Sequence, residues 1–477
     1  MKRYLFVLLI LAVLPLTFLY GQETLSVSKS GFRKEKSGFR DAWRCIKDGD
    51  KLFEAGVGLY TEAAECYLLA YDYNSDNAAL NYKIAVSYMF GGQPLKSLDY
   101  FLKAWELDTA VTADILLLTG RAYHQRADYG KAIDCYNMYS DKYHDSESFN
   151  PLVNELIKQC NYAIEMSGRS APAELFNAGS GINSEYDDYS PVISGEGRLL
   201  YFTTRRPAHE DNKRQSADMR WDENIFVSTR GADGWDPSGP AGDRLATELN
   251  EGVLYVAANG SLMYIYAGYE NNGDVLVSEY KKGRWTKPGA FKPRINSRSR
   301  ETSISLTADG NEMYFTSDRK KGKGGRDIYS IKRIIKNKWT KPFNPGEPLN
   351  SAANEESVYV SGMGDTLWFS SDRKGGMGGY DIYMSVKDKT GEWSEPLNIG
   401  MPANSQSNDM FFIPSPLNED EYWLASDRPG GYGGFDIYHM VITVRPDTVV
   451  VNEEGSSLII QKDTVPGKTA PAMNNFY

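Results

Sequence analysis

Cysteine and histidine are scarce in this chain, with four of each among 477 residues. Their spacing matches no zinc, redox or other metal-ligand motif, so the sequence predicts no metal site and no cofactor. If the chain is exported, disulfides could join Cys45 to Cys66 and Cys135 to Cys160, and buried free thiols are the alternative. The sequence contains no G-x-S-x-G nucleophile elbow. Its glycine-rich segments lead into strand-like DIY sequences, whereas a phosphate-binding loop leads into a helix through Lys-Ser/Thr.

Excess positive charge is also lacking, since the net charge is −10 and the pI is about 5.2. This balance argues against nucleic acid or an anionic membrane surface as the main partner. Long apolar runs are absent beyond the N-terminus. There, two basic residues precede the run Tyr4–Tyr20, which is short for a membrane anchor and contains Pro15. We therefore expect residues 1–21 to be a secretory signal peptide that is cleaved near Gly21.

One thirteen-residue segment occurs three times. It reads SDRKKGKGGRDIY at Ser317–Tyr329, SDRKGGMGGYDIY at Ser371–Tyr383 and SDRPGGYGGFDIY at Ser426–Tyr438, with nine identical positions and spacings of 54 and 55 residues. An active-site loop normally occurs once per domain, whereas self-similarity at a fixed period indicates a repeat architecture. This segment, called the SDR loop below, is therefore predicted to be a structural module first.

A second repeat, with a period near 34 residues, covers residues 45 to about 142. In three successive units a small residue is followed four positions later by an aromatic one. The positions are Ala63, Tyr67 and Ala70; Ser97, Phe101 and Ala104; and Ala132, Tyr136 and Tyr139. The pattern resembles the tetratricopeptide repeat, although the usual Trp is missing and Thr109 replaces a proline. We therefore expect a helical solenoid over residues 45–167 that ends in a capping helix at Pro151–Met166, preceded by a polar arm at 22–44.

The resemblance to tetratricopeptide arrays also implies a concave groove. Upstream of the small-and-aromatic positions, Ala85 and Tyr88 recur 35 residues later as Gly120 and Tyr123. Tyr88 and Tyr123 are the predicted groove residues that would bind a partner protein. The alternative is a spacer that only stacks on the next domain.

Beyond a linker at 168–182, short alternating strands with turn signals indicate an all-β domain at 183–446. Four strands per 54 residues, repeated radially, predict a β-propeller. Unit starts give five blades, or six if the tail at 447–477 adds strands; they are Asn183, Asn250, Asn296, Asn350 and Asn404. The last unit lacks an outer strand, which the segment before the first unit could supply. The pattern DG…YF(S/T)SDR…GG…DIY resembles the TolB-like propeller repeat.

This topology places every SDR loop beside the connection that leads into its blade, on one rim of the propeller. The predicted rim residues are Arg319, Arg373, Arg428, Glu301, Glu355, Asp409 and Asp188. In one interpretation they bind a partner's loop, a peptide terminus or a cation. In the other they form local charge-assisted hydrogen bonds, and the loop glycines supply positive φ angles. The predicted loop-scaffold residues are Asp318, Asp327, Asp372, Asp381, Asp427 and Asp436.

The combination of export, helical repeats and a TolB-like propeller resembles envelope proteins of Gram-negative bacteria, including periplasmic parts of type IX secretion and gliding machinery. The resemblance implies a periplasmic or outer-membrane-associated scaffold that is not an enzyme and that binds envelope proteins through the groove and the rim. Only about thirty residues follow the propeller, so the OmpA-type domain of some relatives is missing and peptidoglycan binding is not expected. The alternative is a glycan-binding or glycan-cleaving propeller, although no unique pair of acids stands out for cleavage.

Overall fold

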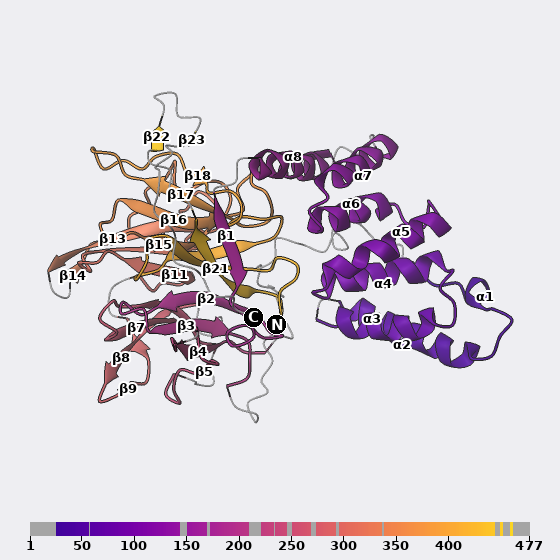
Figure 1. Ribbon diagram of the computed structural model, residues 1–477, viewed down its shortest axis with the longest axis horizontal. Coiled ribbons are helices and arrows are strands. Elements are labelled where there is room, and N and C mark those ends of the chain that lie inside the picture. Colours follow the sequence, from indigo (N-terminus) through magenta and orange to yellow (C-terminus); the bar gives the residue numbers. More distant parts are fainter. Residues whose placement is uncertain are drawn as a thin grey trace, which may run out of the picture.

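The computed structural model describes residues 25–443 except 57, 144–149, 169–171, 209–220, 233, 246–249, 269–272, 292–294 and 336–337, together with 449–451 and 458–460. A helical N-terminal region lies beside a five-bladed β-propeller (Figure 1). This arrangement confirms the predicted fold class. The predicted signal peptide lies outside the described residues. Within the described part of the chain, no helix is both long and apolar enough to cross a membrane.

The helical region consists of pairs of helices that pack against each other. The described helices are α1 (Lys29–Phe32), α2 (Phe39–Ala55), α3 (Tyr60–Tyr71), α4 (Ala78–Phe90), α5 (Ser97–Leu107), α6 (Ile115–Gln125), α7 (Tyr129–Lys142) and α8 (Asn150–Ser167). All nine small-and-aromatic positions named above are buried. A Cβ atom on Gly49 would lie 2.7 Å from the ring of Tyr67, and one on Gly120 would lie 2.6 Å from the ring of Tyr136. Glycine therefore lets each aromatic ring lie directly against the neighbouring helix.

The segment predicted as a polar arm takes part in this core. Phe32 is fully buried and packs with Trp43 and Tyr73. The Tyr73 hydroxyl donates to the carbonyl oxygen of Lys34 at 2.8 Å, and the Asn74 amide donates to that of Phe32 at 2.8 Å. The prediction of a polar arm rested on the basic and polar residues of the segment and overlooked Phe32. One buried aromatic residue is enough to fix a short segment against a helix pair.

Each blade of the propeller is a four-stranded antiparallel sheet. Blade 1 contains β2 (Asp188–Ile193), β3 (Leu199–Thr204), β4 (Asn224–Thr229) and β5 (Gly239–Pro240); blade 2 contains β6 (Gly252–Val256), β7 (Leu262–Tyr266), β8 (Val275–Lys281) and β10 (Gly289–Ala290), with β9 (Arg284–Trp285) paired to β8; blade 3 contains β11 (Glu301–Leu306), β12 (Glu312–Ser317), β13 (Asp327–Ile335) and β14 (Lys338–Trp339); blade 4 contains β15 (Glu355–Val360), β16 (Thr366–Ser371), β17 (Asp381–Val386) and β18 (Leu397–Asn398). Blade 5 contains β19 (Asp409–Pro414), β20 (Glu421–Ser426) and β21 (Asp436–Ile442). Its fourth strand comes from the other end of the domain.

That fourth strand is β1 (Ala173–Asn177), which pairs antiparallel with β21 in the register Ala173↔Ile442 to Asn177↔Tyr438. The strand that enters the domain thus covers the edge of the last blade and closes the ring. Two strands of the tail, β22 (Val449–Val451) and β23 (Leu458–Ile460), pair only with each other among the described residues. The described chain therefore has five blades and not six.

The helical region contacts the propeller at blade 4. Met377, in the SDR loop of that blade, is fully buried and belongs to the hydrophobic core of the helical region. The Gln159 side chain donates to the carbonyl oxygen of Gly378 at 2.7 Å, and Gln406 donates to that of Gln125 at 3.1 Å. These contacts join α6 and α8 to the rim that carries the SDR loops.

Candidate functional site

The predicted rim charges come together as ion pairs inside single blades. Three of these pairs are Arg319 with Glu301 at 3.1 Å, Arg373 with Glu355 at 3.1 Å, and Arg428 with Asp409 at 2.5 Å. In blade 1, Asp188 pairs with Arg206 at 2.9 Å. All four carboxylates are fully buried. The rim arginines thus point inward, into their own blades.

Each of these arginines has further partners within its blade. Arg373 donates through Nη2 to the carbonyl oxygen of Leu349 at 2.7 Å and through Nε to Ser371 at 3.2 Å, and its guanidinium lies 4.9 Å from the ring centre of Tyr383. Burial raises the pKa of Glu355, and hydrogen bonds from Ser351 and the charge of Arg373 oppose that shift. This geometry favours the interpretation in which the rim charges hold the loop.

The six loop aspartates divide into two groups. Asp327 accepts hydrogen bonds from the loop amides of Lys323 at 2.5 Å and Gly324 at 3.0 Å, and Asp381 and Asp436 accept from their own loops in the same way. Asp318, Asp372 and Asp427 instead accept from backbone amides of the connection that leads into the blade, at 2.7–2.8 Å. Burial raises the pKa of Asp427 to about 6.

The glycines shared by the three SDR loops allow close contact with neighbouring backbone. They were predicted instead to supply positive φ angles. In the second copy, the positive φ belongs to Gly375, which the first copy replaces by Lys321. A Cβ on Gly324 would overlap the carbonyl oxygen of Ala353, and one on Gly378 would overlap that of Ser407. Each SDR loop therefore lies directly against the connection that enters the next blade, where only glycine fits.

One rim carboxylate escaped the sequence analysis. Glu251 is 1% exposed, follows Asn250 and directly precedes β6. In blade 5, Asp409 likewise follows Asn408 and is the first residue of β19. Asn250 accepts a hydrogen bond from the amide of Glu223 at 2.8 Å, as Asn408 accepts from that of Tyr380 at 3.0 Å. Asn250 is thus equivalent to Asn408 and does not mark a unit start, so the predicted register of the second unit was wrong.

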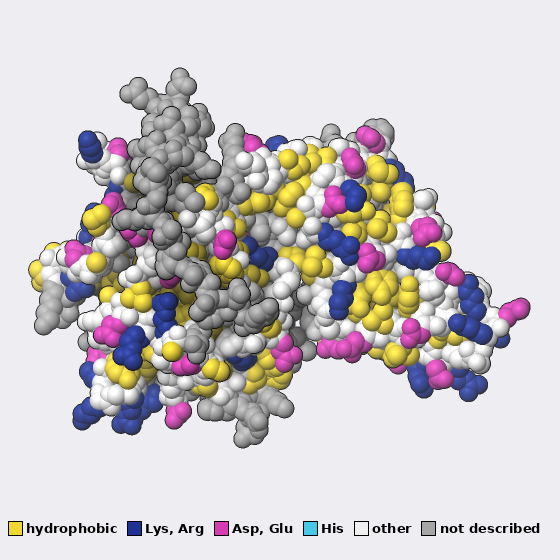
Figure 2. All heavy atoms as spheres, viewed as in Figure 1, with side chains coloured by type: hydrophobic (Ala, Val, Ile, Leu, Met, Phe, Trp, Pro, Cys, Tyr) yellow, Lys and Arg dark blue, Asp and Glu magenta, His cyan; other side chains and the backbone are white. Residues whose placement is uncertain are grey.

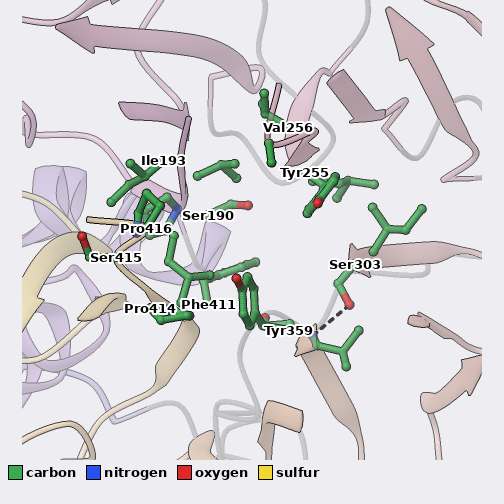
Figure 3. A pocket seen from close by; sticks show the side chains of 18 of the residues that line it. Ser190, Ile193, Tyr255, Val256, Ser303, Tyr359, Phe411, Pro414, Ser415 and Pro416 are labelled. Carbon is green, nitrogen blue, oxygen red and sulfur yellow. Dashed lines mark hydrogen bonds between the residues drawn. The ribbon is translucent and has the colours of Figure 1, made fainter. Parts of the chain in front are cut away.

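A cavity of about 170 Å³ lies at the centre of the propeller (Figure 3). All five innermost strands, β2, β6, β11, β15 and β19, contribute to its lining. Figure 3 shows Tyr255 on one side of the cavity, with Tyr359 and Phe411 on another. Hydroxyl groups line it as well, from Ser190, Thr302, Ser303, Ser357 and Ser415. Among the residues described as lining it, none is Asp, Glu, His, Lys or Arg.

The cavity is separate from the predicted rim site. It extends to Gly195, Ala258 and Pro416, which lie where the innermost strands turn back, and none of the predicted rim residues lines it. The sequence analysis missed the cavity because its residues differ from blade to blade. Burial raises the pKa of Tyr359 to about 12, and the nearby phenol of Tyr255 adds to this shift.

The backbone of the cavity wall is unusual at three equivalent positions. Ser190, Ser357 and Phe411 each follow the rim carboxylate of their strand by two residues and have φ angles of 53°, 53° and 57°. The pairing register of all three strands shifts at this point. Non-glycine residues rarely adopt this left-handed conformation, and bulges of this kind redirect side chains near binding sites.

The two predicted groove residues lie on the helical region, each beneath a lysine. The Lys96 ammonium lies 5.5 Å from the ring centre of Tyr88, and the Lys131 ammonium lies 5.3 Å from that of Tyr123. Tyr88 also packs on Tyr100 with 5.6 Å between ring centres. Both tyrosines are partly buried.

The described residues contain no group of three or more His, Cys, Asp or Glu that could hold a metal ion. The four cysteines are free thiols, so neither of the two disulfides considered above is formed. Burial raises the pKa of Cys160 to about 12 and that of Cys135 to about 11. These thiols therefore remain protonated at neutral pH and are poor nucleophiles.

No protein-family model and no curated protein matches the chain. Several solved structures are similar. The endo-arabinase from Bacteroides thetaiotaomicron is 13% identical, over 57% of this chain and 98% of its own, with a TM-score of 0.37. The alpha-L-arabinofuranosidase from Lactobacillus brevis is 12% identical, over 57% of this chain and 93% of its own, with a TM-score of 0.32. A prolyl endopeptidase is 13% identical, over 56% of this chain and 37% of its own, with a TM-score of 0.27.

These similarities correct one prediction. The chain was expected not to be an enzyme, whereas the similar structures include an endo-arabinase and an arabinofuranosidase, so that expectation is withdrawn. At identities of 12–13% and TM-scores below 0.4, no substrate and no catalytic residue carries over from these proteins to this chain. The function has to be argued from the site itself.

Proposed function

We propose that the propeller binds neutral carbohydrate in its central cavity, and that the protein is a carbohydrate-binding or carbohydrate-processing protein. The observation that supports this proposal is the chemistry of the lining, in which three aromatic rings and the hydroxyl groups of five Ser and Thr residues surround a space whose described lining has no charged side chain. Aromatic faces pack against the apolar C–H faces of a sugar ring, and hydroxyl groups exchange hydrogen bonds with its edges. An ionic ligand would lack a counter-charge here, and desolvating it would be costly.

A carboxylate lies one hydrogen bond away from the cavity. Thr302, which lines the cavity, donates through Oγ1 to Glu356 Oε2 at 2.7 Å. The other carboxylate oxygen of Glu356 pairs with Arg326 at 2.6 Å. Glycoside hydrolysis uses a pair of carboxyl groups on either side of the scissile bond. If the bound sugar is cleaved, Glu356 is the first acid to test.

The test is a titration of the full chain against a panel of neutral oligosaccharides, with release of reducing ends measured in the same samples. The Tyr359→Ala variant should bind about tenfold more weakly because it loses an aromatic face of the cavity. Phe343→Ala is the matched control, since Phe343 is 64% exposed and does not line the cavity. Absence of binding to every neutral sugar would refute the proposal. Hydrolysis that disappears in Glu356→Gln would identify the protein as processing its ligand.

A second candidate function is partner binding by the helical region, which the two lysine-covered tyrosines favour. Figure 2 shows hydrophobic side chains beside Lys and Arg on the visible face of this region, and Leu95, Leu102 and Leu107 are each 37% exposed. The partner class is that of the sequence analysis, namely envelope proteins met after export to the periplasm. In-cell cross-linking of the full chain should then capture an envelope protein that a Tyr88→Ala/Tyr123→Ala double variant fails to capture.

A further inference from the structure

The cavity wall contains one hydroxyl group that the free protein leaves without a partner. The Ser357 side chain is 95% buried, since its exposed fraction is 5%, and its Oγ makes no hydrogen bond to any described residue. A buried hydroxyl without a partner has lost its hydration and gained no hydrogen bond in return, which disfavours the folded state. Most buried hydroxyl groups in proteins are paired, so an unpaired one at a cavity calls for an explanation.

Two other serines of the wall use their hydroxyl groups for the fold. Ser190 has the same left-handed conformation as Ser357, yet its Oγ donates to the carbonyl oxygen of Val253 at 2.7 Å. Ser303 Oγ accepts from the amide of Val358 at 3.1 Å and lies 2.7 Å from Thr316 Oγ1 (Figure 3 draws the first of these bonds). Ser357 therefore differs from both, because a ligand would not have to break a bond within the protein to reach its hydroxyl.

The size of the cavity limits what it can hold. Its volume of about 170 Å³ is below the roughly 300–1,000 Å³ of sites for drug-sized ligands. A single sugar ring is therefore a better match than an oligosaccharide that lies inside the cavity. Longer sugars would extend beyond the cavity, past the turns at Gly195, Ala258 and Pro416.

We infer that Ser357 is the specificity-determining residue of this site, and that its hydroxyl hydrogen-bonds a hydroxyl of one neutral sugar unit held in the cavity. The inference rests on the proposed function. The left-handed backbone at Ser357, with φ of 53°, holds this residue in the cavity wall at a conformational cost that a plain strand would avoid. Its Oγ is buried in the free protein, and rotation about the Cα–Cβ bond to another staggered position would turn the hydroxyl toward the ligand.

The experiment compares Ser357→Ala with Ser370→Ala in the full chain. Ser370 is fully buried, its Oγ is also without a partner among the described residues, and it lies outside the cavity on β16 of the same blade. Neither alanine removes a hydrogen bond from the free protein, so both variants should unfold at the temperature of the wild type or slightly above it. The probes are D-glucose, D-galactose, L-arabinose and N-acetyl-D-glucosamine, titrated singly and as their short oligosaccharides by calorimetry.

For the sugar that binds the wild type best, Ser357→Ala should weaken binding about 3- to 10-fold, whereas Ser370→Ala should leave it unchanged. Deoxy analogues locate the contact: the analogue that lacks the bonded hydroxyl should bind the wild type and Ser357→Ala equally weakly. Equal binding of the parent sugar by wild type and Ser357→Ala would overturn the inference and leave the proposed function standing. If the wild type binds none of the probes and no member of the wider panel, the proposed function itself fails.

Discussion

The two ends of the propeller differ in how their polar groups are used. On the rim that carries the SDR loops, charge is abundant, and the four arginine–carboxylate pairs that recur from blade to blade each close within their own blade, with the carboxylates fully buried. In the central cavity, charge is absent from the described lining, three backbone positions are left-handed and one hydroxyl is unpaired. The repeated residues thus satisfy one another, and the residues that break the repeat line the space where a ligand fits.

The same contrast applies within one SDR loop. The nine shared positions build the loop, but the seventh position varies between Lys323, Met377 and Tyr432. Met377 is fully buried in the helical core, whereas Tyr432 is 53% exposed. The shared residues thus form the blade, and the residue at a variable position determines which blade contacts the helical region.

The largest expected effect comes from opening a rim pair. Arg373→Ala leaves the fully buried Glu355 carboxylate without its guanidinium partner, and we expect a loss of about 3–5 kcal/mol in the free energy of unfolding, measured by urea denaturation. Lys131→Ala, which opens an exposed pair with Asp128, should cause little change. An Arg373→Met/Glu355→Gln double variant should recover part of the loss, because no charge remains buried. Equal stability of Arg373→Ala and wild type would show that the rim arginines are free to bind a partner.

The next effect tests the loop-to-loop contact. Gly324→Ala places a Cβ against the backbone carbonyl of Ala353, which cannot move without shifting the connection into blade 4, so we expect a loss of about 3 kcal/mol. Gly239→Ala is the matched control, since a Cβ there meets no atom within 4 Å. Thermal unfolding of both variants checks the comparison. If the two substitutions cost the same, the shared glycines serve loop flexibility and not close contact.

Repetition explains how much could be predicted. The small-and-aromatic positions from Ala63 to Tyr139 and the three SDR loops predicted a helical region, a five-bladed propeller and buried helix contacts, because each was supported by several copies. The rim pairs also followed from topology, since Arg319 and Glu301 recur at fixed positions. Patterns that occur in every blade depend on local geometry, and local geometry can be inferred from sequence.

The remaining features depend on contacts that occur once. Nothing in the sequence around Met377 indicates that this residue, and not Tyr432, meets the helical region. In the sequence, Ser357 is one serine in a strand pattern. Its left-handed backbone conformation accompanies the register shift of β15, which the sequence does not indicate. Glu251 was missed because Ala246 stands where the other connections begin with Asn, and Asn250 was taken for the start of the unit. Single positions of this kind are fixed by tertiary packing, which a repeat does not record.

A smaller effect should follow from separating the two regions. Met377→Ala removes the side chain that blade 4 inserts into the helical core, and we expect a loss of about 2–3 kcal/mol in the stability of the helical region. Hydrogen exchange measured by mass spectrometry should show faster exchange in α6 to α8 and unchanged exchange in the blades. Tyr432→Ala, at the equivalent exposed position of blade 5, is the control and should leave both regions unchanged. Uniform acceleration of exchange across the blades would mean that the two regions unfold as one unit.

The smallest effect concerns pH, which should act in opposite directions on the two regions. Burial, with the nearby charge of Arg121, lowers the pKa of His124 to about 4, so its contribution to stability is complete above pH 6.5 and is lost as the pH falls toward 4. At pH 5 the helical region should be less stable than at pH 7 by about 2 kcal/mol from this residue alone. Burial raises the pKa of Asp427 to about 6, so its contribution is complete below about pH 3.8 and is lost as the pH rises through 6.

Acidification from pH 7 to pH 5 should therefore weaken the helical core around His124 while the blade 5 rim around Asp427 gains stability. Region-resolved hydrogen exchange at the two pH values measures both changes in one sample, and His124→Gln and Asp427→Asn should each remove the change in its own region only. His124 lies in α6, and the carbonyl oxygen of the last residue of this helix, Gln125, accepts a hydrogen bond from Gln406 of the propeller. Protonation of His124 should therefore loosen the contact between the regions before either region unfolds. If His124→Gln responds to acid as the wild type does, the helical region owes its pH dependence to its surface carboxylates, and the contrast between the regions does not extend to their titration.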